Sequence, residues 1–208
     1  MTVAIIDYDV GNLKNVETAL KALDIDCTIT RDHKSIDDAS AIVLPGVGAF
    51  ADAMNNLEKF DLYATLVKNV KKGKPLLGIC LGMQLLFDKS FEDGEWKGLG
   101  FIPGQVVRFE DTRETGLKVP HMGWNNLTLH QSEDPIVQGL SSQDYVYFVH
   151  SYYAVPDQFD QNVVAYAQYG VRVPAIVRQD NVLGMQFHPE KSAAVGKRLL
   201  INWKEFIS

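Results

Sequence analysis

The chain has 208 residues, of which 46% are hydrophobic and 22% are charged, and its formal net charge at pH 7 is −6. This composition is that of an ordinary globular domain, and it excludes disordered, collagen-like and general nucleic-acid-binding classes. The two cysteines, Cys27 and Cys80, are too few for a disulfide scaffold. Because the sequence carries no targeting signal and no apolar run of membrane-spanning length, we expect one domain over residues 1–208 in the cytoplasm.

The first half of the chain alternates strand and helix patterns. Short apolar runs rich in β-branched residues predict buried strands, and apolar residues three or four positions apart predict helices. The expected strands are Thr2–Ile6, Cys27–Thr30, Ala41–Leu44 and Pro75–Ile79. The expected helices follow Gly11-Asn12, cover Ala51–Lys72 in two pieces with Asp61 capping the second, and run from Leu81 to Phe87.

The second half is richer in strands. The expected strands are Val106–Phe109, Asn126–Leu129, Tyr145–Val149, Val163–Tyr169, Val173–Val177 and Val182–Phe187, and the expected helix is Ala193–Ile207. The order predicts an α/β fold with a mostly parallel central sheet, flanked by helices and extended by antiparallel strands. Sites in such sheets lie beyond the carboxyl ends of the strands, so the residues after Ile6, Leu44, Ile79 and Phe187 are the candidates.

Cys80 stands at the centre of a G-x-C-x-G pattern, Gly78–Gly82, between an expected strand and an expected helix. This is the pattern of a nucleophile elbow, in which small neighbours allow a sharp turn that lifts the nucleophile above the sheet. The following helix N-terminus favours the thiolate. An isolated Cys is more often a buried core residue, which is how we interpret Cys27, but the context of Cys80 favours a nucleophile.

His188-Pro189-Glu190 follows the last expected strand and precedes the last helix. A cysteine nucleophile needs a base, and the base needs an acceptor that orients it. We therefore expect His188 as the base and Glu190 as its orienting carboxylate. A surface loop with a solvated His and Glu is the alternative for this segment taken alone.

Pro45–Gly48 also follows a buried strand, and its glycines let the backbone turn its N–H groups toward a ligand. We expect an oxyanion hole formed by Gly46, Val47 and Gly48 with Leu81 as the second donor. A plain turn is the alternative. The five histidines show no metal-ligand spacing, and no dinucleotide or P-loop motif is present, so we expect neither a metal nor another cofactor.

These three motifs, in this order, resemble the class I (triad) glutamine amidotransferases. Within that family the segments Ile6–Leu13, Pro45–Phe50, Gly78–Phe87, Pro120–Asn125 and His188–Ser192 resemble the glutaminase subunits of imidazole glycerol phosphate synthase, from histidine biosynthesis. One departure is Asp9, where the family pattern has Gly. Asp tolerates left-handed backbone better than most residues, so only the fine shape of that loop is affected.

The resemblance implies that glutamine is hydrolysed to glutamate and ammonia through a thioester on Cys80. It implies substrate contacts from Gln84 and from the segment His150, Ser151 and Tyr152, although a solvated Gln84 and a half-buried His150 are the structural alternatives. It also implies a partner, a (β/α)8-barrel cyclase, which uses ammonia to make imidazole glycerol phosphate and an aminoimidazole carboxamide ribotide.

We expect Trp124, Tyr147 and Lys191 at that interface, with core packing of the aromatics and a solvated Lys191 as alternatives. Three other functions remain open at this point. They are a glutaminase subunit of a different ammonia-using synthase, a stand-alone γ-glutamyl hydrolase, and a silent binding subunit; Pro120–Asn125 argues against the first, and an intact set of Cys80, His188 and Glu190 against the last.

Overall fold

A mixed eight-stranded sheet runs through the computed structural model, which describes residues 1–110 and 117–208. The strand order is β2-β1-β3-β4-β14-β13-β12-β9. The first five strands pair in parallel and the last three pair antiparallel. This arrangement confirms the predicted fold class, a mostly parallel sheet extended by antiparallel strands.

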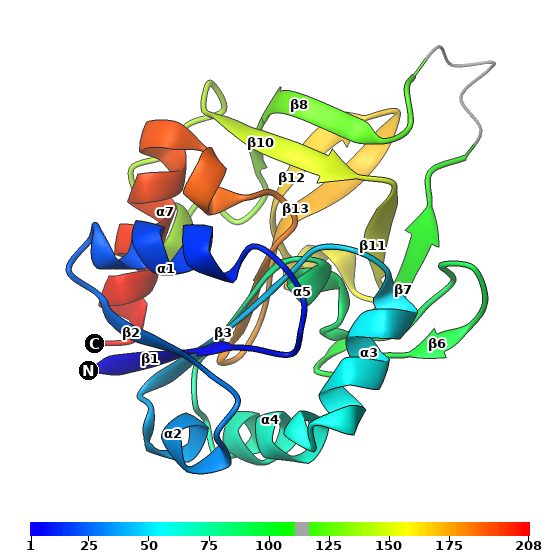
Figure 1. The fold of residues 1–208 in the computed structure, drawn as a ribbon. Coiled ribbons are helices and arrows are strands. Elements are labelled where there is room, and N and C mark those ends of the chain that lie inside the picture. Colours follow the sequence, from blue (N-terminus) through cyan, green and yellow to red (C-terminus); the bar gives the residue numbers. More distant parts are fainter. Residues whose placement is uncertain (111–116) are drawn as a thin grey trace.

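The parallel part is built by alternating strands and helices (Figure 1). Its elements are β1 (Thr2–Ile6), α1 (Leu13–Lys21), β2 (Asp26–Thr30), α2 (His33–Asp38), β3 (Ala41–Gly46), α3 (Phe50–Lys59), α4 (Leu62–Lys71), β4 (Leu76–Cys80) and α5 (Leu81–Gln84). β3 and β4 are buried along their whole length, which explains their uninterrupted apolar sequences.

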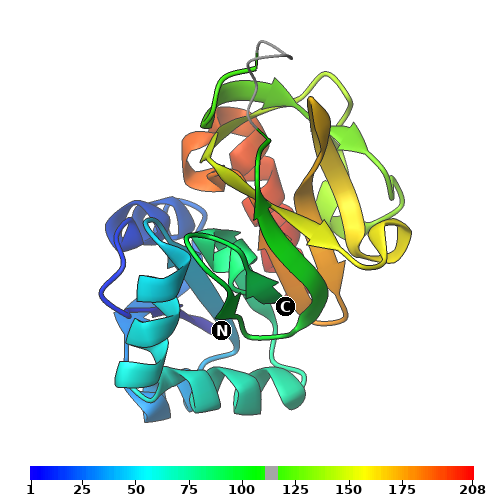
Figure 2. The same cartoon turned by 90° about the vertical axis from the view of Figure 1, so that its right-hand side faces the viewer.

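The later elements complete the sheet and add two smaller ones. They are β5 (Phe87–Ser90), β6 (Trp96–Lys97), β7 (Ile102–Arg108), β8 (His121–Asn126), β9 (Thr128–Leu129), η1 (Pro135–Val137), β10 (Tyr145–His150), β11 (Tyr152–Pro156), α6 (Phe159–Asn162), β12 (Val163–Tyr169), β13 (Val171–Gln179), β14 (Val182–Met185), η2 (Pro189–Lys191) and α7 (Ala193–Phe206). β8 and β10 form a two-stranded antiparallel sheet, and β11-β7-β5-β6 form a four-stranded one. Figure 2 shows this strand-rich part lying beside the helices of the first half.

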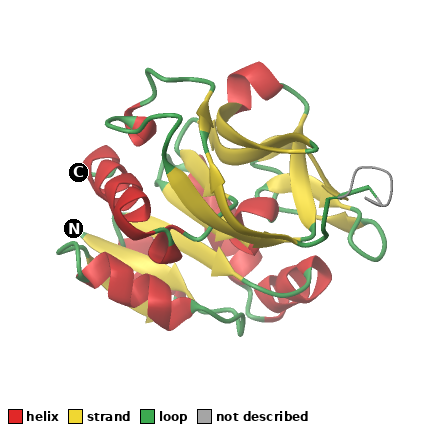
Figure 3. Ribbon diagram, turned by 90° about the horizontal axis from the view of Figure 1, so that it is seen from above, coloured by secondary structure: helices red, strands yellow, loops and turns green. Residues whose placement is uncertain are grey.

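Helices cover both faces of the central sheet, as the view from above shows (Figure 3). One apolar cluster joins buried residues of α2, α3 and α4 to the sheet, and a second joins those of α1 and α7 to its other face. The largest fully buried side chain, Trp203, lies on α7 in the second cluster. Within the described ranges no helix is long and apolar enough to cross a membrane.

Three local predictions are wrong. Asp61 separates α3 from α4, but it adopts a left-handed conformation with φ 55° and makes no side-chain cap. The helix after Cys80 ends at Gln84 instead of Phe87, because Leu85, Leu86 and Phe87 are all buried and lead into β5. The strand expected at Asn126–Leu129 is not continuous: it covers only the last residue of β8, which begins at His121, and the separate short strand β9.

Candidate active site

Cys80 lies at a sharp turn where β4 ends and α5 begins. Its φ of 55° and ψ of −111° place it in a strained backbone conformation that non-glycine residues rarely adopt. The turn is possible because the residues two positions away on either side, Gly78 and Gly82, have no side chain. A Cβ on Gly82 would lie 1.8 Å from the carbonyl oxygen of Leu44, and one on Gly78 would lie 2.6 Å from that of Gly82. The G-x-C-x-G pattern is thus a requirement of backbone packing, and Cys80 adopts the geometry of a nucleophile elbow.

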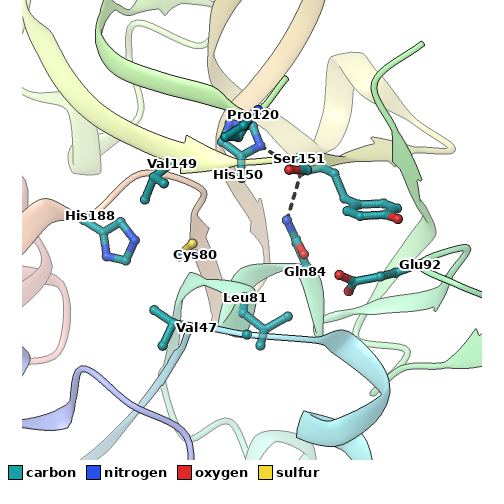
Figure 4. Close-up of a pocket in the computed structure, with 12 residues that line it drawn as sticks. Val47, Cys80, Leu81, Gln84, Glu92, Pro120, Val149, His150, Ser151 and His188 are labelled. Atoms are coloured by element: carbon teal, nitrogen blue, oxygen red, sulfur yellow. Dashed lines mark hydrogen bonds between the residues drawn. The ribbon is translucent and has the colours of Figure 1, made fainter. Parts of the chain in front are cut away.

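His188 and Glu190 come from the segment after β14, the strand that pairs with β4 in the sheet. The imidazole Nδ1 lies 2.7 Å from Oε1 of Glu190, and both side chains are almost fully buried. Because a carboxylate only accepts hydrogen bonds, Nδ1 carries the proton and Nε2 is left as the basic nitrogen. Nε2 is buried and has no hydrogen-bond partner in the described chain. Figure 4 shows the ring beside the Cys80 sulfur, so the imidazole is placed to accept a proton from the thiol.

The charged states of His188 and Glu190 stabilise each other. Burial alone opposes a charge on His188, but Cys80 and Glu190 outweigh it and raise the pKa of His188 to about 9. Burial also opposes the charge on Glu190, yet hydrogen bonds from His188 and Asn12 lower the pKa of Glu190 below its usual value. At neutral pH the ring therefore holds a proton that it can pass to a leaving group.

Asn12, which sequence reasoning did not select, completes this group. Its amide Nδ2 donates to Oε1 of Glu190 over 2.8 Å and lies 3.5 Å from Nδ1 of His188. The residue sits between β1 and α1, so it reaches Glu190 across 178 positions of sequence. Asn12 lies six residues after the expected strand Thr2–Ile6, and no local motif marks its contact with Glu190.

The segment Pro45–Gly48 ends β3 next to the elbow. A Cβ on Gly46 would lie 2.6 Å from the hydroxyl of Tyr8 and 3.1 Å from Cβ of Leu81, so the chain passes very close to both. The Tyr8 hydroxyl donates to the carbonyl of Pro45 over 2.6 Å, and burial raises the pKa of Tyr8. Gly48 has a φ of 104°, a conformation that favours glycine.

A pocket of about 460 Å³ opens above the elbow. Its lining brings together residues from six parts of the chain, namely Val47, Gly48, Cys80, Leu81, Gln84, Glu92, Pro120, Val149, His150, Ser151, Tyr152 and His188. Figure 4 shows their side chains arranged around one space. A single pocket is thus lined by the expected nucleophile, the expected base and the two expected binding segments. Of the expected oxyanion residues, Gly46 is not part of the lining.

The side chains of Gln84 and His150 form a buried hydrogen-bond network at the back of the pocket. Gln84 Nε2 donates to the carbonyl of Tyr152 over 3.0 Å and to Oε1 of Gln186 over 3.1 Å. Nδ1 of His150 donates to the same Tyr152 carbonyl over 2.7 Å, because a carbonyl can only accept. The two side chains therefore fix the backbone of Ser151 and Tyr152 at the pocket wall. Neither is solvated or half-buried, since both are about 95% buried.

A second histidine, His121, supports His150 from behind. Its Nδ1 lies 3.0 Å from Nε2 of His150, and its own Nε2 lies 3.2 Å from Nδ2 of Asn125. Burial lowers the pKa of His121 to about 4 and that of His150 to about 3. Both rings are neutral at neutral pH, with Asn125 donating to His121 and His121 donating to His150.

Glu92 is the carboxylate that lines the pocket, and the sequence analysis did not select it. It lies in the β5–β6 hairpin, and its Oε2 accepts the backbone N–H of Phe50 over 2.8 Å at the start of α3. Burial raises the pKa of Glu92, while the Phe50 hydrogen bond opposes that shift. Figure 4 shows its carboxylate at the opposite end of the pocket from His188. No sequence motif marks it, because the hairpin was not predicted.

Trp124 and Tyr147 form an aromatic pair close to His188. They lie opposite each other on β8 and β10, and their ring centroids are 6.0 Å apart in an edge-on arrangement. Trp124 is 53% exposed, so it is not core, whereas Tyr147 is half-buried. The carbonyl of Tyr147 accepts the backbone N–H of His188 over 3.1 Å. Lys191, which follows the triad glutamate, is exposed.

No cluster of His, Cys, Asp and Glu capable of holding a metal occurs among residues 1–110 and 117–208. The side chains at the pocket, Cys80 with the buried His188–Glu190 pair at one end and the Glu92 carboxylate at the other, are those that nucleophilic cysteine chemistry requires.

Comparison with known proteins identifies the class. The family model described as glutamine amidotransferase class-I matches residues 4–205, so the chain belongs to this family. Its fold is also that of PurLQS from Thermotoga maritima, with a TM-score of 0.77 at 19% identity over 100% of this chain and 99% of that one. A structure titled glutamine amidotransferase gives a TM-score of 0.74 at 22% identity over 99% and 98%.

Closer relatives specify the branch within the family. The chain is 47% identical over 207 residues to the imidazole glycerol phosphate synthase subunit HisH of Carboxydothermus hydrogenoformans, covering 100% of both chains. It is 46% identical over 206 residues to the same subunit of Aquifex aeolicus, covering 98% of this chain and 96% of the relative. The branch of glutamine amidotransferases to which the chain belongs is thus that of the HisH subunits, as the motifs predicted.

Proposed function

We propose that this chain is the glutaminase subunit of an imidazole glycerol phosphate synthase and acts in the cytoplasm as one domain over residues 1–208. It hydrolyses L-glutamine to glutamate and ammonia and passes the ammonia to a cyclase in histidine biosynthesis. The single observation that carries the proposal is the strained Cys80 facing a buried His188–Glu190 pair in one pocket, in a chain of this family.

Hydrolysis proceeds in two halves through a thioester. The sulfur of Cys80 attacks the carboxamide carbon of glutamine, and the proton of Cys80 is held on Nε2 of His188. The tetrahedral intermediate collapses as its C–N bond breaks, and His188 gives that proton to the nitrogen, which leaves as ammonia. His188 then takes a proton from water and the hydroxide attacks the thioester. The C–S bond breaks to release glutamate, and the proton stays on His188 beside the sulfur.

The oxyanion of each tetrahedral intermediate needs backbone N–H donors. We assign this role to Gly46, Val47 and Gly48 together with Leu81, because the first three border the elbow and Leu81 directly follows the nucleophile. Two such donors in a dry site contribute several kcal/mol of transition-state stabilisation, about 3 kcal/mol each.

The amino-acid end of glutamine needs partners for an ammonium and a carboxylate. We assign the ammonium to Glu92, because its carboxylate lies in the pocket away from Cys80. We assign the carboxylate to backbone N–H groups of the segment His150, Ser151 and Tyr152. Gln84 supports this contact, because its side chain donates a hydrogen bond to the Tyr152 carbonyl and so holds the backbone in place. Glutamine would then lie along the pocket with its amide at Cys80.

Ammonia must reach its acceptor without being protonated in bulk water, so the glutaminase must dock on the enzyme that uses it. We propose a (β/α)8-barrel cyclase as the partner, which makes imidazole glycerol phosphate and an aminoimidazole carboxamide ribotide. On this chain, the surface that docks on the cyclase includes Trp124, Tyr147 and Lys191. An exposed tryptophan backed by a tyrosine is typical of an interface anchor, and the exposed Lys191 can pair with a carboxylate of the partner.

Ammonia release from glutamine tests the proposal. The wild type and Cys80→Ala are assayed with and without the cyclase subunit and its nucleotide substrate, and Cys27→Ala serves as the matched control, because Cys27 is the other buried cysteine and lies outside the pocket. We expect low turnover alone, strong stimulation by the cyclase, no activity for Cys80→Ala and full activity for Cys27→Ala. Turnover that is high without a partner would favour a stand-alone γ-glutamyl hydrolase, and stimulation only by another synthase would favour a different complex.

A further inference from the structure

The side chain of Asn12 does not cap α1, although the residue stands at the N-terminus of that helix. Asn12 precedes α1 as its N-cap residue, where an asparagine side chain ordinarily accepts a backbone N–H of the first helical turn. Here it makes no such cap. Its amide nitrogen instead donates to Oε1 of Glu190 over 2.8 Å, the same oxygen that accepts from Nδ1 of His188 over 2.7 Å.

The direction of this hydrogen bond is fixed by its surroundings. A carboxylate can only accept, so the amide nitrogen of Asn12 must face Glu190. The amide oxygen of Asn12 faces the other way and accepts from Nδ2 of Asn15 over 2.8 Å. Both ends of the Asn12 amide are therefore used, and the side chain is held in one orientation.

Glu190 needs such a donor because of where it lies. Its side chain is only 2% exposed, and a buried carboxylate is costly unless hydrogen bonds and charges compensate for the lost water. His188 compensates while it carries its second proton. During the reaction His188 gives that proton to the leaving ammonia and becomes neutral, and the charge that faced Glu190 is then lost. The Asn12 amide is a neutral donor that persists through both states.

We propose that Asn12 is a positioning residue of the triad, which holds the Glu190 carboxylate ionised and aimed at His188 while the imidazole changes charge. Asn12 is not itself among the residues that line the pocket, and its amide contacts Glu190 and His188, so it acts through these two side chains. The titratable groups that this contact affects are Glu190, His188 and, through His188, Cys80.

The first experiment measures the rate at which iodoacetamide alkylates Cys80 as a function of pH, in the full chain with Cys27→Ala as background. It needs no glutaminase activity. In Asn12→Ala the imidazolium loses part of its support, so we expect the pH limb at which the thiolate forms to move up by about one unit and the limb at which His188 deprotonates to move down. Asn55→Ala is the matched control, because Asn55 is an exposed asparagine on α3 outside the triad.

Asn12→Leu separates donation from packing. Its side chain is similar in size to that of Asn and adds no charge, but it cannot donate a hydrogen bond to Glu190. We expect its acid limb to shift in the same direction as that of Asn12→Ala. A residue that only fills space would leave Asn12→Leu with the wild-type profile. Thermal unfolding of each variant identifies a loss of fold, and the Leu variant decides if the Ala variant is unstable.

The second experiment rests on the proposed glutaminase function and measures kcat and KM for glutamine in the complex with the cyclase. We expect kcat to fall about tenfold or more in Asn12→Ala with KM within a few-fold of wild type, because Asn12 lies outside the pocket. Alkylation profiles of both variants that coincide with wild type would overturn the proposal. Absence of ammonia release from every protein, wild type included, would instead overturn the proposed function and leave the alkylation result as the test of Asn12.

Discussion

The substitution Glu92→Gln tests whether the Glu92 carboxylate binds the ammonium group of the substrate. The substitution removes the negative charge but keeps an oxygen that can accept the Phe50 N–H now bonded to Oε2 at 2.8 Å. The start of α3 therefore stays anchored, and the change is confined to the attraction between the pocket and an ammonium group.

The expected magnitude follows from the half-buried position of Glu92. A hydrogen bond to a charged group contributes about 1.5–3 kcal/mol, and each 1.4 kcal/mol corresponds to a factor of ten, so KM for glutamine should rise about 10- to 100-fold. Because Glu92 lies at the far end of the pocket from His188, kcat should change by less than about threefold. Glu92→Ala also removes the acceptor of the Phe50 N–H, and we expect it to lower kcat as well, because α3 begins two residues after Gly48.

The assay compares glutamine with 4-carbamoylbutanoate, which has the same carboxamide but no amino group. Wild type and Glu92→Gln are measured with both substrates in the presence of the cyclase. Glu95→Gln is the matched control, because Glu95 is an exposed acid of the same hairpin outside the pocket. Glu92→Gln should impair glutamine hydrolysis and leave the analogue nearly unaffected. An equal loss for both substrates would refute the reasoning, since the carboxylate would then act on something other than the ammonium.

Three further predictions concern stability. Gly82→Ala places a Cβ 1.8 Å from the Leu44 carbonyl oxygen, so the free energy of unfolding should fall by about 1–3 kcal/mol or more in urea titrations, and an unchanged midpoint would contradict the close packing. His188 has a pKa raised to about 9 in the folded chain, so its contribution is present below pH 6.5 and is lost between pH 6.5 and 9; this loss, up to about 3 kcal/mol, should be smaller in Cys80→Ala than in wild type. His150 has a pKa lowered to about 3, so it contributes stability above pH 6.5 that is lost as the pH falls toward 3, and His150→Phe should show a shallower decline between pH 6 and 4 than wild type.

Trp124→Ala should weaken binding of the cyclase by about 30-fold, as for a central interface tryptophan, in a titration by fluorescence or calorimetry. Phe206→Ala, at an exposed aromatic on the C-terminal helix, is the control and should bind normally. Equal affinities for the two variants would place the docking surface elsewhere.

The sequence predicted the parts of the fold that follow from local rules. Buried parallel strands such as β3 and β4 appear as unbroken apolar runs, and the glycines around Cys80 reflect the close packing of the elbow. Cys80 and His188 could be selected as candidates because one ends a buried strand and the other lies shortly after one.

What could not be predicted depends on contacts between distant segments. β8 was misplaced because Met122 and Trp124 are apolar yet exposed, which hides the alternation of a strand. Asn12 and Glu92 gain their importance only from the residues that they meet, Glu190 in one case and the start of α3 in the other. A single sequence contains no local pattern that predicts either contact.

The register between β4 and β14 has a mechanical consequence. Ile79 pairs with Met185, so Cys80 and the segment that carries His188 leave the same edge of two hydrogen-bonded strands. Gly46 pairs with Cys80 in the neighbouring ladder, so the start of the proposed oxyanion segment belongs to the same rigid sheet. Glu92 lies outside this sheet, in the β5–β6 hairpin. The molecule thereby combines a stiff centre, where we propose that the covalent bond forms, with a rim on which a docked partner can act.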